Sequence, residues 1–142
     1  MKSLLFVHSS LRWAILLTLI MAIIIAFRKR KVDQVNKKDK LIYLLSLIII
    51  HSQLLIGIVM YYFSSKVTFN DDTMGHSLFR FFTIEHTLGM LIAIILVTIG
   101  YKKGKKDKGH KKIFIYYLSA TIIILISIPW PFREGLGVSS WI

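Results

Sequence analysis

The stretch LLFVHSSLRWAILLTLIMAIIIAF, residues 4–27, decides the fold class. It is long enough to cross a bilayer as a helix, because one crossing needs about 20 predominantly apolar residues. Three further stretches, at 41–63, 79–101 and 113–132, have a similar length and apolar character. The sequence therefore predicts an all-α integral membrane protein, with four transmembrane helices in a single domain over residues 1–142.

The first stretch is expected to remain in the mature protein as an anchor. Its positive charges, RKRK at 28–31, follow the apolar run, and no small-residue cleavage site comes after it, in contrast to a secretory signal peptide. The chain contains no cysteine. Disulfides, thiolate catalysis, iron–sulfur clusters and covalent heme attachment are therefore excluded, and histidine is the main candidate metal ligand.

The basic residues are concentrated in two loops. Of the 19 lysines and arginines, seven lie within residues 28–40 and seven within 102–112. Short basic loops beside apolar spans are typical of the cytoplasmic side of a membrane, where they contact anionic lipid headgroups. We therefore expect membrane lipid, and no nucleic acid, as a partner. In a bacterial inner membrane both termini would then be periplasmic.

Short connections between successive spans favour an up-down antiparallel four-helix bundle, in which the first and third helices are diagonal. His76 and His110 are expected in solvated loops. Four tyrosines near the basic loops are expected to anchor the spans at the cytoplasmic interface: Tyr43, Tyr101, Tyr116 and Tyr117.

Ionisable residues within or beside the spans are the candidate functional residues, because they are costly in a membrane and usually face the bundle interior. They are His8, Arg12, His51, Arg80, Glu85, His86 and Arg133. A rise of ~1.5 Å per residue places His8 and His86 at one depth, roughly 6 to 8 Å below the outer surface of the hydrocarbon, and His51 near the midplane.

Two imidazoles at equal depth on diagonal helices suit axial ligation of a heme iron. His86 and His8 are the predicted ligands, with His51 as the alternative to His8. His51 has two other candidate roles: a proton-carrying or quinone-contacting group, or a partner in a helix–helix hydrogen bond. Gly89 follows His86 by one turn and would let a flat ring approach the backbone, or would serve helix packing.

Three arginines, Arg12, Arg80 and Arg133, are expected near the outer, non-cytoplasmic side of the membrane, where positive charge is usually scarce. Arg12, Arg80 and Arg133 would hold two propionates or a quinone headgroup through bidentate contacts. The alternative is a structural ion pair with Glu85 or Glu134.

Three motifs suggest a family: HSSLRW at 8–13, EHTLG at 85–89 and IPWPF at 128–132. Over nearly its whole length the chain resembles small four-span proteins of the Bacteroidetes group that are often labelled cytochrome B. A looser likeness is to heme A synthase. The stretches EHTLG and HSQLLIG (51–57) resemble the Glu-x-x-His-Arg and Gln-x-x-x-Gly segments of that family, but no arginine follows His86 here. The resemblance implies a non-covalent b-type heme between two histidines, and electron transfer or a place as a small subunit of a respiratory complex.

An alternative from another class remains open at this point. The chain would be a cofactor-free structural or accessory membrane subunit, whose polar residues form an interhelical network. A carrier or ion pathway is weaker, because four spans without an internal repeat leave little for alternating access in one chain.

Overall fold

The computed structural model describes residues 2–106 and 109–136. Four of its helices are long and apolar enough to cross a membrane. Three are uninterrupted: α1 (Lys2–Arg28), α2 (Lys37–Phe63) and α5 (Gly109–Ser127). The third span is composed of α3 (Ser77–Arg80), the π-helical turn η2 (Phe81–Glu85) and α4 (His86–Gly104). The prediction of an all-α, four-span membrane protein is confirmed.

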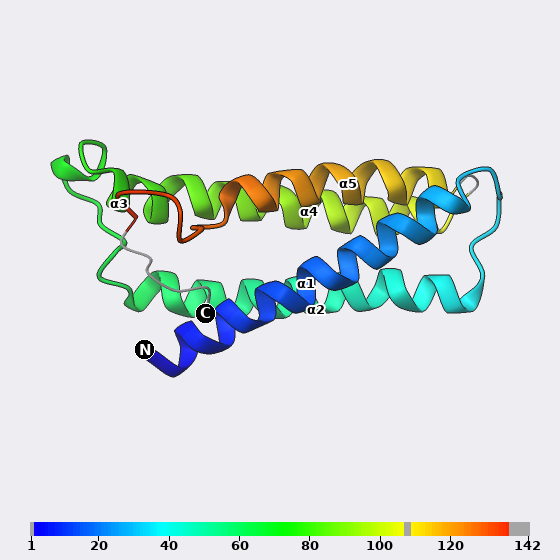
Figure 1. Ribbon diagram of the computed structural model, residues 1–142, viewed down its shortest axis with the longest axis horizontal. Helices are drawn as coiled ribbons and strands as arrows, with labels where there is room; N and C mark the ends of the chain where they lie inside the picture. Colours follow the sequence, from blue (N-terminus) through cyan, green and yellow to red (C-terminus); the bar gives the residue numbers. More distant parts are fainter. Residues whose placement is uncertain (1, 107–108, 137–142) are drawn as a thin grey trace.

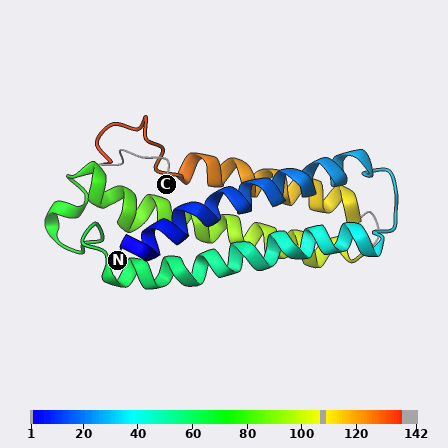
Figure 2. The ribbon, with the colours of Figure 1, turned by 60° about the horizontal axis from the view of Figure 1, so that its bottom comes forward.

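The helices run alternately in opposite directions, as Figure 1 shows. α4 packs along α5, α1 contacts both α2 and α5, and α2 also contacts α4. Helices α1 and α4 are therefore diagonal (Figure 2). We call the end with the connections at 29–36 and 105–106 the basic end. The opposite end, where α1 begins and where the short 3-10 turn η1 (Asp71–Thr73) lies, is called the histidine end.

The largest differences from the predicted spans lie at the start of α2 and at the two ends of α5. α2 begins at Lys37, four residues before the apolar stretch, because the Asn36 side chain accepts a 2.8 Å hydrogen bond from the Asp39 amide and caps the helix. α5 covers Gly109–Ser127 and ends before residue 132. Pro129 explains the early end, since proline has no amide hydrogen and disfavours helical geometry in the residue before it.

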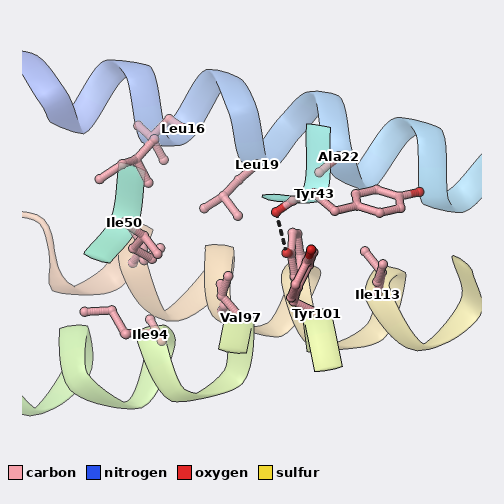
Figure 3. Packing of buried hydrophobic residues seen from close by; sticks show 14 of the residues in the cluster. Leu16, Leu19, Ala22, Tyr43, Ile50, Ile94, Val97, Tyr101 and Ile113 are labelled. Carbon is pink, nitrogen blue, oxygen red and sulfur yellow. Dashed lines mark hydrogen bonds between the residues drawn. The ribbon is translucent and has the colours of Figure 1, made fainter. Parts of the chain in front are cut away.

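The outer faces of the helices are apolar, and the buried core is narrow. Leu55 and Ile126 are 66% and 68% exposed, as expected for side chains that contact lipid. The core contains small and branched residues such as Leu19, Ala22 and Val97 (Figure 3). Such an apolar exterior would be a large exposed patch on a water-soluble protein. The chain is therefore a multi-pass membrane protein.

The prediction that Tyr43 and Tyr117 anchor the interface is wrong, because both are fully buried in the core. Their hydroxyl groups have partners within the bundle. Tyr117 donates a 3.0 Å hydrogen bond to the Tyr43 carbonyl (dashed line in Figure 3), and the Tyr43 hydroxyl forms a 2.7 Å hydrogen bond with Nδ1 of His110. His110 was expected in a solvated loop. It lies instead in the first turn of α5, fully buried.

Candidate functional site

The imidazoles of His8 and His86 meet across the bundle near the histidine end. His8 lies in α1 and His86 is the first residue of α4. Their ring centroids are 6.4 Å apart, with 64° between the ring planes. Two histidines from diagonal helices are thus brought together, as their matched depths in the sequence predict.

His86 is oriented by a hydrogen bond from another helix. Its Nδ1 lies 2.8 Å from the Ser127 carbonyl oxygen of α5. A carbonyl oxygen only accepts, so Nδ1 carries the hydrogen and Nε2 keeps its lone pair in the neutral ring. Metal-binding histidines usually make this hydrogen bond, because it fixes the orientation of the ring and the nitrogen that faces the metal. Phe81 and Phe82 flank the ring at centroid distances of 5.9 and 6.3 Å.

The Ser127 carbonyl is available to His86 because Pro131 of the IPWPF motif follows it by four residues, about one helical turn. In a continuing helix this carbonyl would accept from the amide of residue 131, which is Pro131 and has no hydrogen. The two preceding carbonyls of α5 also accept from side chains. Trp130 Nε1 donates to the Leu125 oxygen at 2.8 Å, and Arg133 Nη1 donates to the Ile126 oxygen at 2.9 Å.

Gly89 permits the close approach of α4 and α5 at this point. A Cβ atom at Gly89 would collide with the side chain of Ser127. The sequence suggested that Gly89 either lets a flat ring approach the backbone or serves helix packing. The contact with Ser127 is a helix-packing contact. Because the Ser127 carbonyl holds His86, Gly89 also contributes indirectly to the orientation of that ring.

His8 has a polar atom without a protein partner. Its Nδ1 is buried and has no hydrogen-bond partner among the described residues, as is also true of Oε1 of Gln53. Gln53 Nε2 donates a 2.7 Å hydrogen bond to the His8 carbonyl and so connects α2 to α1 at this level. Next to it, Gly57 leaves room, because a Cβ atom there would meet only Cε1 of His8, at 3.5 Å.

Two imidazoles are too few donors to hold a bare metal ion, but they would suffice as the protein ligands of a heme iron. Two imidazoles that bind one metal in line, at ~2.0 to 2.1 Å from each nitrogen, have ring centroids roughly 6 to 6.5 Å apart; the observed separation is 6.4 Å. The described residues contain no group of three or more His, Asp or Glu side chains that would hold a metal ion alone. A porphyrin supplies four nitrogens itself and needs only two axial ligands.

Arg12 and Arg133 both lie near aromatic residues of the histidine end. The Arg12 guanidinium carbon is 5.4 Å from the Trp13 ring centroid and 5.8 Å from that of Trp130. The Arg133 guanidinium carbon is 4.7 Å from the centroid of Phe81, which flanks His86. Positive charge is therefore held beside the histidine pair by cation–π contacts.

Arg80 forms a structural ion pair with Glu85, which was the alternative to holding a propionate or a quinone headgroup. Its Nε lies 2.8 Å from Oε1 of Glu85, and its Nη1 donates to the Met74 carbonyl at 3.2 Å. Residues five apart do not face each other on an α-helix. Here the π-helical turn η2 widens the helix and brings them together, and such turns are frequent at functional sites.

His51 lies apart from the His8–His86 pair. Its Nδ1 donates a 2.8 Å hydrogen bond to the Leu47 carbonyl one turn earlier in α2. It lines an open, apolar hollow between α2 and α4 together with Thr98. Thr98 is twelve residues beyond His86, or ~18 Å along α4. His51 therefore lies deeper in the membrane span, as its position in the sequence predicts.

A second polar cluster, at the basic end, was missed in the sequence. Lys29 and Asp39 form a 2.6 Å ion pair, and Oδ2 of Asp39 lies 3.7 Å from Nε2 of His110. His110 in turn bonds Tyr43. The signal for it was the placement of Asp39 and His110 at helix starts, on the faces that continue as Tyr43 and Tyr117.

Comparison of the chain with protein-family models, with curated proteins and with solved structures found no match. The geometry of the two polar clusters and the motifs HSSLRW, EHTLG and IPWPF are thus the observations on which a function is proposed.

Proposed function

We propose that this chain is a b-type cytochrome-like electron-transfer protein, with one non-covalent heme b between His8 and His86. The observation that carries the proposal is the meeting of these two imidazoles, from diagonal helices, at a centroid separation of 6.4 Å. The buried Nδ1 of His8, which has no partner among the described residues, supports it, because coordination of the iron by this nitrogen would compensate the burial of a polar atom. The resemblance to four-span proteins labelled cytochrome B is consistent with it.

The residues around the pair would act by orientation and charge. The Ser127 carbonyl holds the His86 ring by its Nδ1 hydrogen, which raises the basicity of the opposite nitrogen. The guanidinium groups of Arg12 and Arg133 place positive charge nearby and would favour the reduced state of a bound group. Heme would supply a one-electron couple, and two axial histidines favour electron transfer over oxygen activation.

The proposed location is the bacterial inner membrane, with the basic end in the cytoplasm and the histidine end at the periplasmic side. The concentration of lysine and arginine in residues 28–40 and 102–112 supports this orientation. Candidate partners are a quinone or a larger respiratory complex that would exchange electrons with the heme. The chain would then be an electron-transfer component of an assembly rather than a stand-alone enzyme.

An absorption spectrum of the full chain, purified in detergent from heme-replete cells, tests the proposal. We expect a Soret band and sharp visible bands on reduction. His8→Ala and His86→Ala should each abolish these bands. His51→Ala is the matched control and should keep them, because His51 lies deeper and bonds its own helix. Colourless wild-type protein, or unchanged bands in both His8→Ala and His86→Ala, would refute axial ligation by this pair.

A cofactor-free accessory subunit is the second candidate, and the hydrogen bonds of the histidine end favour it. The His86–Ser127 bond joins α4 to α5, and the Gln53–His8 bond joins α2 to α1, so polar side chains also specify the packing. Under this function the purified protein has no heme bands, and His86→Ala lowers only its thermal stability. The same spectra therefore separate the two candidates.

A further inference from the structure

We propose that a pocket at the basic end binds a phosphate-bearing anion, of the kind presented by an anionic phospholipid headgroup. The pocket has a volume of about 340 Å³ and lies between the start of α2, the end of α4 and the segment 33–35. This volume is within the usual range for small-molecule sites. The pocket is at the opposite end of the bundle from the histidine pair, so the proposal is independent of heme binding.

The charges around the pocket favour an anion. Lys40, Lys105 and Lys106 line it, and Asp33 is the acidic residue among its lining side chains. Within residues 2–106 and 109–136, no carboxylate lies within 4.0 Å of these three ammonium groups, whereas the nearby Asp39 is engaged by Lys29. Three lysines, one from the first turn of α2 and two from the connection after α4, thus line one hollow.

Two tyrosines of the pocket wall, Tyr43 and Tyr101, have partners within the protein. Tyr43 is held from two sides, by His110 at its hydroxyl and by Tyr117 at its carbonyl. Tyr101 also lines the pocket, and Nζ of Lys105 lies 4.9 Å from the centroid of its ring. Figure 3 shows Tyr43 and Tyr101 at the same end of the buried cluster. Side chains that already have partners lose less conformational entropy when a ligand binds.

Glycine contacts close the pocket on the side of α5. A Cβ atom at Gly104 would collide with Ile113, and one at Gly109 would collide with the Gly104 carbonyl. The end of α4 and the start of α5 therefore approach each other closely, and the pocket lies beside them at the ends of the spans. Phosphate groups of lipids lie at this level, and basic pockets between transmembrane helices are typical headgroup sites.

Titration of the detergent-purified full chain tests the proposal. The probes are dioctanoyl phosphatidylglycerol, dioctanoyl phosphatidylcholine and sodium phosphate, and the readouts are calorimetric binding and the thermal unfolding midpoint. We expect saturable binding of phosphatidylglycerol with a raised midpoint, and none for the zwitterionic phosphatidylcholine. Binding of sodium phosphate as tight as that of phosphatidylglycerol would assign the site to a soluble phosphate; weaker binding of sodium phosphate would assign it to the lipid.

Matched variants distinguish the pocket from diffuse surface charge. Lys40→Gln/Lys105→Gln/Lys106→Gln should weaken phosphatidylglycerol binding at least about tenfold. Lys38→Gln/Lys102→Gln/Lys111→Gln removes the same charge from the same two regions, at exposed positions outside the pocket, and should change the affinity less than about twofold. Lys106→Gln alone, also exposed, should weaken binding about threefold and serves if the triple variant does not fold.

Two results would overturn the proposal. One is the absence of saturable binding of either phosphatidylglycerol or sodium phosphate to the wild-type chain. The other is an equal loss of affinity in the two triple variants. Neither result depends on the heme spectrum, so the pocket and the histidine site succeed or fail separately.

Discussion

A single backbone oxygen, that of Ser127, orients the His86 imidazole. It does so because Gly89 lets α5 approach α4 so closely that any larger side chain at this position would overlap Ser127. The position of a candidate ligand thus depends on a residue that contacts neither the other histidine nor a cofactor. Residues of this kind are tested better through stability than through binding.

Gly89→Ala should destabilise the protein, whereas Gly57→Ala should not. Both substitutions gain about 0.5–1 kcal/mol in helix preference. At Gly89 the new methyl group overlaps Ser127, which costs typically about 1–3 kcal/mol. At Gly57 its nearest neighbour is His8 Cε1, at an ordinary 3.5 Å. Denaturant unfolding in detergent measures both, and equal stability of the two variants would contradict a packing role for Gly89.

Tyr43→Phe should lower stability by about 1–3 kcal/mol, because it leaves the buried His110 Nδ1 without its partner. Tyr62→Phe is the control: Tyr62 is exposed, and its ring contacts Phe63, so the change should stay within about 0.5 kcal/mol. Thermal unfolding followed by tryptophan fluorescence compares them. A loss in Tyr62→Phe as large as in Tyr43→Phe would show that the His110 bond contributes nothing.

The end of α5 is determined by the two prolines of IPWPF. They remove the amide hydrogens that the carbonyls of Leu125 and Ser127 would accept in a longer helix. Trp130 and His86 supply the replacement donors. The motif therefore ends the helix and at the same time presents acceptors to the histidine end.

Pro129→Ala/Pro131→Ala should lengthen α5 by about one turn, since both missing donors return. Amide hydrogen exchange over residues 128–133 should then slow, and the His86–Ser127 bond should be replaced by a backbone hydrogen bond. Phe132→Ala lies in the same exposed segment and restores no donor, so it is the matched control. Unchanged exchange in the double variant would mean that tertiary contacts, and not the prolines, end the helix.

The number of spans, their order and the matched depth of His8 and His86 were predictable, because they depend only on apolar length and rise per residue. The burial of His110 was missed, because its place at a helix start does not by itself identify Tyr43, on another helix, as its hydrogen-bond partner. The π-helical turn η2 was also missed, since its five residues, FFTIE, carry no distinctive signal in one sequence. The ion pair of Arg80 with Glu85 depends on that turn.

The two ends of the bundle differ in charge. The basic end carries the two lysine-rich connections and the anion pocket, and the histidine end carries the imidazole pair. The long apolar faces between them contact lipid. Which end faces the cytoplasm determines the compartment with which the histidine end would exchange electrons and the membrane leaflet whose headgroups reach the pocket.

Single cysteines can establish this orientation, because the chain has no cysteine of its own. Phe69→Cys lies between α2 and η1 at the histidine end, and Val32→Cys lies between α1 and α2 at the basic end. Both positions carry exposed apolar side chains, so the variants are matched. A membrane-impermeant maleimide should label Phe69→Cys in intact bacterial cells, and Val32→Cys only after the inner membrane is disrupted.

The reverse labelling pattern would contradict the proposed orientation. It would also mean that the chain does not follow the orientation that its charge distribution favours. Fourteen basic residues would then face the periplasm, where the positive-inside rule disfavours them. The contacts within the bundle would be unaffected by such a result. The histidine pair would, however, face the cytoplasm, so that its proposed electron partners would have to be sought on that side of the membrane.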